Sequence, residues 1–199
     1  MQVSVAAIII VAIVLVLVMS TIAYLVRTRR VRQSFISFFI RYIAIFGALF
    51  LIEYAFLELL PSLHEALRNL TATIVGGIVG LAGMEPVVSG PLITLQDPSL
   101  AFDITVGCLG GVLFWVYIGL VFAESGITRR QRILGIAAGL SVLLAFNIFR
   151  MALSLYLQEL TGVYVHDYFY FFNIVFVLLV WAVWTRTMRV KAAVVSSAT

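Results

Sequence analysis

The sequence predicts an all-α integral membrane helical bundle with about five spanning helices, one re-entrant or interfacial helix and a small extracellular β-hairpin. Of its 199 residues, 63% are hydrophobic and only 11% are charged, and the mean hydropathy is +1.15. This usage lies far from that of soluble domains. Each crossing needs about 20 residues, so the length leaves no room for a separate soluble domain. We therefore expect one polytopic membrane domain over residues 1–199.

Long apolar runs mark the spanning helices. The first run, Val3 to Val26, lacks the basic start and small-residue cleavage site of a signal peptide, so we expect a retained membrane helix. Further spanning helices are predicted at residues 35–60, 108–124, 133–157 and 168–185.

Basic residues indicate the orientation of these helices. Most of the 13 Lys and Arg residues lie in three short clusters beside the apolar runs: Arg27, Arg29, Arg30 and Arg32; Arg129, Arg130 and Arg132; and Arg186, Arg189 and Lys191. The positive-inside rule places such clusters in the cytoplasm. The N-terminus is then outside and the C-terminus cytoplasmic. Because the net charge of +4 is divided among these clusters, we expect no nucleic-acid partner.

The segment between the second and third spanning helices must begin and end outside. Residues 67–84 are apolar and rich in glycine, but a crossing here would move the second basic cluster to the outer side. We therefore predict a re-entrant or interfacial helix covered by the bundle, with Gly76 and Gly80 allowing close packing.

Residues 85–107 are predicted to form an outer hairpin loop. Leu100, Phe102, Ile104 and Val106 alternate with Ala101, Asp103 and Thr105, which is the period of a strand. The preceding QDPS, residues 96–99, has the composition of a turn. This strand would lead the chain to Cys108, and the glycines after Cys108 would leave room for a substrate backbone or a neighbouring helix.

Three side chains with catalytic potential are predicted at the outer surface. Cys108 would begin one helix, Arg150 would lie in the outer half of the next, and His166 would lie in the loop before the last. The unpaired N–H groups and the dipole of a helix N-terminus favour a thiolate. Attack of a thiolate on a peptide carbonyl also needs a proton donor, which suits His166, and a stabilised oxyanion, which suits Arg150.

Each of these residues also has a purely structural interpretation. A lone cysteine is often an inert packing residue, and a loop histidine is usually solvated or interfacial. An arginine at this depth costs at least about 2.5 kcal/mol unless it finds partners or its side chain extends to the interface.

Three further residues are candidates for supporting roles. Asn147 and Ser154 share a helix face with Arg150 and either orient it or form interhelical hydrogen bonds. Asp167 is placed next to His166 and could orient it. The single cysteine excludes an internal disulfide, a CxxC pair and a cysteine-built zinc site, and we expect no cofactor and no metal.

Three motifs resemble the exosortase/archaeosortase family of membrane-embedded transpeptidases. They are GCLGG at the start of a membrane helix, NIFRMALSLYL in the next helix and VHDYFYF before the last, and together they extend the resemblance over residues 103–184. The Cys, Arg and His of the family correspond to Cys108, Arg150 and His166. Leu-Gly-Gly follows the cysteine where many members have Ser-Gly, so the subfamily stays open.

The resemblance implies a cysteine protease/transpeptidase at the outer face of the cell membrane. Its substrates would be secreted proteins with a C-terminal sorting tail made of a short signature, a hydrophobic helix and a basic cluster. Cleavage would pass through a thioacyl-enzyme, and the acceptor would be a lipid head-group amine or another amine.

Two alternative functions remain open from the sequence. The chain could be a small transporter or channel component, with Arg150 as an anion site and residues 67–84 as a broken helix, although the sequence lacks the internal repeats usual in transporters. It could also be a non-catalytic membrane scaffold, in which Cys108, Arg150 and His166 would each tolerate substitution.

Overall fold

The structure, a computed structural model, describes residues 29–95, 101–162 and 166–197. The predicted first span, Val3 to Val26, and the QDPS turn lie outside these residues. The described chain is mostly helical, as predicted, with helices α2 (Arg29–Leu59), α3 (Pro61–Leu81), α4 (Gly111–Ala123), α5 (Arg129–Thr161) and α6 (His166–Ser197).

Two described helices have the length and composition of membrane spans, namely Phe35–Leu59 within α2 and the whole of α5. The apolar part of α6, Phe172–Met188, is shorter. Helix α4 has 13 residues and is therefore about 20 Å long, less than the roughly 30 Å of bilayer hydrocarbon. Within the described residues, the prediction of five spanning helices is thus not supported.

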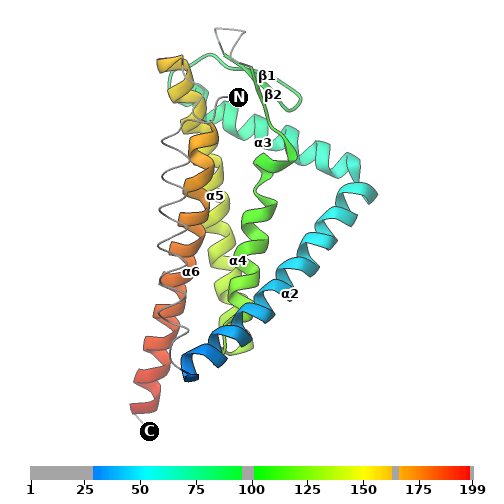
Figure 1. Cartoon of the computed structure of the whole chain (residues 1–199). Coiled ribbons are helices and arrows are strands. Elements are labelled where there is room, and N and C mark those ends of the chain that lie inside the picture. The colour runs from blue at the N-terminus through cyan, green and yellow to red at the C-terminus, as the bar shows by residue number, and fades with distance from the viewer. Residues whose placement is uncertain (1–28, 96–100, 163–165, 198–199) are drawn as a thin grey trace.

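Helices α4, α5 and α6 run side by side, and α2 packs against α4 before leaning away from the bundle (Figure 1). The start of α2, the start of α5 and the end of α6 lie at one end of the molecule (Figure 1). These are the helix ends that adjoin the three basic clusters. The sheet and α3 lie at the opposite end.

Helix α3 lies across the sheet end of the bundle (Figure 1) and contacts α5, β1 and β2. It begins at Pro61, directly after α2, because proline fits the first turn of a helix, where its missing N–H leaves no bond unmade. A β-carbon on Gly76 would overlap the Val88 side chain. This glycine therefore allows close packing against a strand, and not against another helix.

The small sheet contains β1 (Val87–Ser89), β2 (Leu92–Thr94) and β3 (Phe102–Asp103), antiparallel and in that order. The predicted hairpin is present as β2 and β3, which pair antiparallel and lie on either side of QDPS in the sequence. The structure adds β1, which is joined to β2 by a turn at Gly90, whose φ of 59° suits glycine. The predicted strand 100–106 pairs only at Phe102 and Asp103, because the chain turns into a 3₁₀ helix at Val106.

The buried side chains form two clusters. One joins α3, the sheet and α5, and includes Cys108. The other lies among α4, α5 and α6 around Tyr117, whose hydroxyl donates to the Gly135 carbonyl at 2.9 Å. The first cluster fixes α3 and the cysteine turn against α5, and the second fixes α4 against α5 and α6.

Candidate active site

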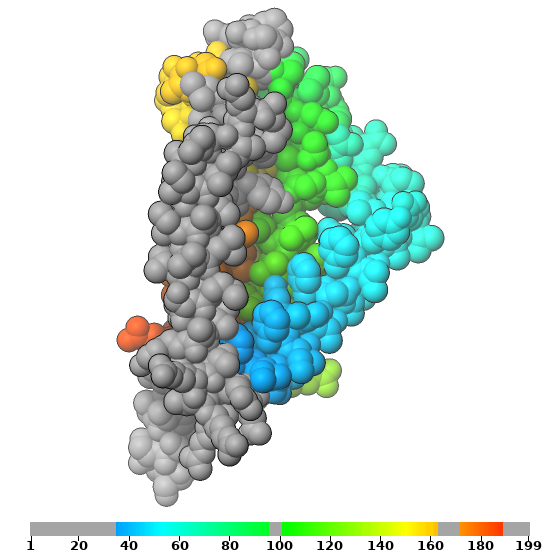
Figure 2. Space-filling view, viewed as in Figure 1, coloured from blue at the N-terminus to red at the C-terminus, as the bar shows by residue number. Residues whose placement is uncertain are grey.

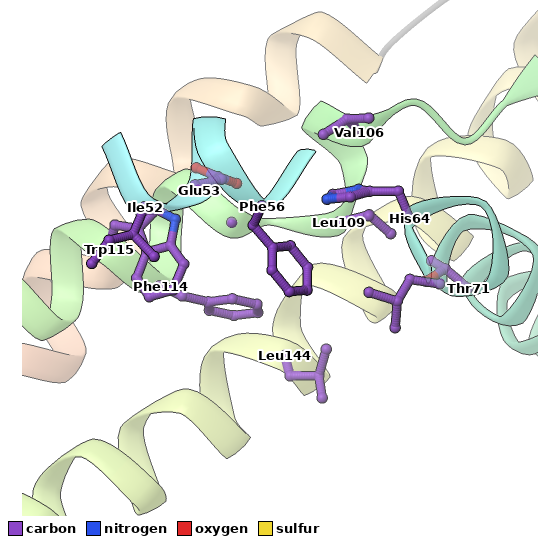
Figure 3. Close-up of a pocket in the computed structure, with 12 residues that line it drawn as sticks. Ile52, Glu53, Phe56, His64, Thr71, Val106, Leu109, Phe114, Trp115 and Leu144 are labelled. Atoms are coloured by element: carbon purple, nitrogen blue, oxygen red, sulfur yellow. The ribbon is translucent and has the colours of Figure 1, made fainter. Parts of the chain in front are cut away.

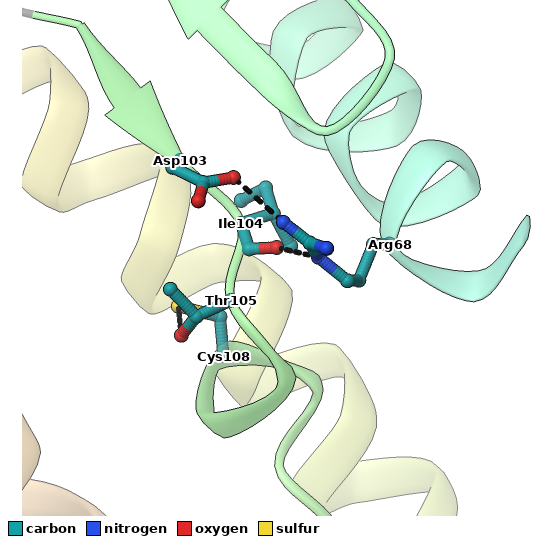
Figure 4. Close-up of polar contacts among 5 residues, drawn as sticks. All are labelled: Arg68, Asp103, Ile104, Thr105 and Cys108. Carbon is teal, nitrogen blue, oxygen red and sulfur yellow. Dashed lines mark hydrogen bonds and ion pairs between the residues drawn. The ribbon is translucent and has the colours of Figure 1, made fainter. Parts of the chain in front are cut away.

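Cys108 lies in a 3₁₀ turn, Val106–Leu109, between β3 and α4. Its N–H donates to the Thr105 carbonyl at 3.0 Å, and its Sγ lies 3.4 Å from Thr105 Oγ1 (Figure 4). Gly110 follows with a left-handed φ of 80°, and α4 begins at Gly111. The prediction that the helix begins at Cys108 is therefore wrong, because the left-handed glycine separates the turn from the helix.

Asn147 on α5 links Cys108 to Arg150. Its Nδ2 donates to the Cys108 carbonyl oxygen at 2.7 Å, and its Oδ1 accepts a bond of 3.4 Å from Arg150 Nη2. The predicted nucleophile and the predicted oxyanion partner are thus joined through one amide side chain. The sequence left two interpretations of Asn147 open, and the geometry combines them, since it both contacts Arg150 and bonds to a neighbouring segment.

Arg150 is 1% exposed, so its guanidinium is enclosed by protein and does not extend to an interface. A cation buried in protein or in the membrane needs polar partners within the protein, and the Asn147 amide is one of them. Ser154 donates to the Arg150 carbonyl at 2.8 Å. This bond lies within α5, so the Ser154 hydroxyl donates to the backbone of its own helix and not to another helix.

His166 is the first residue of α6, and Asp167 is the second. The prediction of a loop at these positions is therefore wrong at the level of the backbone. Helix α6 begins at the end of the molecule that carries the sheet (Figure 1). The side chains of both residues lie outside the described part of the chain.

The polar face of α5 continues beyond the residues singled out from the sequence. Gln158, 3% exposed, follows Asn147, Arg150 and Ser154 at helical spacing and is buried like them. That periodicity was sufficient to identify it. Asn173 on α6 is also buried, at 1% exposure, but it is a lone polar residue in an apolar run and gives no periodic signal.

An ion pair fixes the strand that leads to Cys108. Arg68 on α3 donates through Nη2 to Asp103 Oδ1 at 2.9 Å and through Nε to the Ile104 carbonyl at 2.5 Å (Figure 4). Sequence reasoning missed Arg68, because its partners lie more than 30 residues away. The pair anchors α3 to the chain immediately before the cysteine turn.

The two glycines after Leu109 accommodate neighbouring helices. A β-carbon on Gly110 would lie 3.1 Å from the Asn147 amide nitrogen, and one on Gly111 would overlap the Glu53 carboxylate of α2. The glycine pair was predicted to leave room for a substrate backbone or for a neighbouring helix. The structure supports the second role, because side chains of α5 and α2 occupy the space beside the two glycines. Glu53 is a second residue near the turn that sequence reasoning did not assign to the site.

Among the described residues, no group of three or more His, Cys, Asp or Glu side chains could hold a metal ion. Comparison with known protein families, with curated proteins and with solved structures gives no match for this chain.

Proposed function

We propose that the protein is a membrane-embedded cysteine transpeptidase of the exosortase/archaeosortase type, with Cys108 as its nucleophile. The observation that carries this proposal is the Asn147 side chain, which bonds to the Cys108 carbonyl and to the Arg150 guanidinium. A packing cysteine needs no buried arginine linked to its carbonyl through an amide side chain, whereas an acyl-transfer site needs fixed positive charge near the nucleophile.

In the first step, the Cys108 thiolate attacks the scissile carbonyl carbon. A C–S bond forms, the peptide C–N bond breaks, and the leaving amine takes a proton from protonated His166. In the second step, an acceptor amine attacks the thioester, the C–S bond breaks, and the proton lost by the amine returns to His166. Arg150 stabilises the oxyanion in both steps.

The substrates we propose are secreted proteins with a C-terminal sorting tail, and the acceptor is a lipid head-group amine or another amine. The enzyme would work as a multi-pass protein of the cell membrane, with the sheet end outside and the basic end in the cytoplasm.

Two observations support a membrane setting. No residue of Phe35–Leu59 is buried, and its exposed large apolar side chains are Ile36, Phe39, Ile40, Ile43, Phe50, Leu51, Ile52, Tyr54, Phe56 and Leu59. Such a surface is unfavourable in water. In addition, the three helix ends with basic clusters lie together (Figure 1), as the positive-inside rule requires.

The proposal is tested by co-expressing the full chain with a reporter that ends in such a tail, taken from a secreted protein of the same genome. We expect Cys108→Ala and Cys108→Ser to abolish the shortening of the reporter on gels. The matched control is Met151→Leu, a conservative change in the same buried cluster, which should leave processing intact. Continued shortening with Cys108→Ala, at unchanged membrane abundance, would contradict the proposal.

A further inference from the structure

A cavity of about 340 Å³ lies between α2, α3 and the start of α4, where the α2–α3 arm stands away from α4 in the space-filling view (Figure 2). Its walls are largely apolar and include the rings of Phe56, Phe114 and Trp115 (Figure 3). This volume falls in the range of small-molecule sites.

Two titratable side chains interrupt this apolar wall, Glu53 from α2 and His64 from α3 (Figure 3). Glu53 lies against Gly111, the first residue of α4. Both ring nitrogens of His64 are buried and have no hydrogen-bond partner among the described residues. A buried polar group without a partner costs about 1–3 kcal/mol, so these nitrogens favour a ligand that hydrogen-bonds to them.

The charges of the lining define the kind of ligand. Glu53 is the one carboxylate among the lining residues, and no Lys or Arg lines the cavity. An anion would meet a carboxylate and no cation, and a plain hydrocarbon would leave His64 unsatisfied. An ammonium group would bond to Glu53 in a charge-assisted manner and would be attracted by the faces of the aromatic rings.

We infer that this cavity binds an amphiphilic primary amine, with the alkyl chain against the aromatic wall and the amine between Glu53 and His64. Val106 and Leu109, which flank Cys108 in the 3₁₀ turn, both line the cavity. The bound amine is therefore held beside the nucleophile's turn. Resting on the proposed function, this cavity is the binding site of the acceptor that receives the acyl group. The bound ammonium group first passes one proton to a ring nitrogen of His64, and the free amine then attacks the thioester.

The inference is tested by fluorescence quenching of Trp115 in the purified full chain, in detergent, with Trp181→Phe and Trp184→Phe removing the other tryptophans. The probes are 11-bromoundecylamine, 11-bromoundecanol and 11-bromoundecanoic acid, whose bromine quenches on contact. We expect saturable quenching by the amine at about tenfold lower concentration than by the alcohol, and the weakest effect from the acid.

Variants distinguish binding of the probes in the cavity from their general partition into detergent. Glu53→Gln should reduce quenching by the amine to the level seen with the alcohol. His64→Leu should also weaken quenching by the amine. The matched control, Glu58→Gln, changes an exposed carboxylate on the same helix and should leave quenching unchanged. Equal quenching by all three probes, or amine selectivity that survives both Glu53→Gln and His64→Leu, would overturn the inference.

Two further arms identify the source of the amine and separate this inference from the proposed function. Quenching by phosphatidylethanolamine with brominated chains, but not by brominated phosphatidylcholine, indicates a lipid head group. Quenching by bromoundecylamine alone indicates a free amine. Cys108→Ala should bind the amine as the parent protein does. If the parent protein cleaves the reporter but shows no preference for the amine over the alcohol, the cavity inference is refuted and the proposed function is not.

Discussion

At the scale of single residues, the candidate site depends on the two bonds of Asn147. One bond satisfies the carbonyl of the cysteine turn, and the other holds a guanidinium that is 1% exposed. Gly110 makes this possible, since its missing β-carbon leaves space for the amide. Identifying Cys108, Arg150 and Asn147 needed only residue chemistry and helical spacing. Their connection across α5 and the turn is a long-range contact that no local pattern contains.

The first prediction concerns Asn147→Ala. This change leaves the Cys108 carbonyl without its donor, so we expect the free energy of unfolding to fall by about 1–3 kcal/mol and reporter processing to fall sharply. Thermal unfolding in detergent and the gel assay measure the two effects. Ser141→Ala is the control, because Ser141 is exposed on the same helix and bonds only to its own helix backbone. Equal behaviour of the two variants would show that Asn147 has no special role.

At the scale of elements, the long apolar runs predict α2 and α5 well, because twenty or more apolar residues leave few alternatives to a helix. The region around Cys108 was predicted less accurately. Hydropathy does not distinguish a 3₁₀ turn from the first turn of an α-helix, so the boundary depends on the left-handed Gly110. The strand before Cys108 was predicted from its alternation but too long, at residues 100–106, because only Phe102 and Asp103 pair with β2.

The second prediction tests the contact between α2 and α4. Gly111→Ala places a methyl group where the Glu53 carboxylate lies, so we expect a lower thermal midpoint in detergent. Combining it with Glu53→Ala should recover much of this loss, because the two groups share one space. Gly47→Ala is the control on α2, where an added methyl group meets no atom within 4 Å and alanine favours the helix. A Gly111→Ala protein as stable as the parent would contradict the described packing.

At the scale of the whole molecule, the basic helix ends and the cysteine turn lie at opposite ends of the bundle (Figure 1). The basic clusters and the apolar runs together predicted this separation, because Lys and Arg near apolar runs indicate the side of the membrane. The number of crossings was less predictable, since an apolar run does not reveal that α4 is only 13 residues long. Which face of α2 packs against α4 was not predictable from the sequence, because apolar residues lie on all sides of this helix.

The third prediction tests the orientation in cells. In a Cys108→Ala background, Ser89→Cys puts a thiol on exposed β1, and Ser125→Cys puts one in the exposed loop between α4 and α5. We expect a membrane-impermeant maleimide to label position 89 in intact cells and position 125 only after permeabilisation. Both residues are exposed, so accessibility alone does not produce a difference. The reverse pattern would place the cysteine turn in the cytoplasm and refute the proposed orientation.

The central claim is that Cys108 carries the acyl group, and the most direct measurement is the mass of the purified enzyme after incubation with a tailed substrate. We predict a covalent adduct on the peptide that contains Cys108, with the mass of the substrate up to the cleavage point. Neutral hydroxylamine should release it, as expected for a thioester, and Cys108→Ala should not form it. Cleaved substrate without a hydroxylamine-sensitive adduct, or an adduct that persists in Cys108→Ala, would contradict the account.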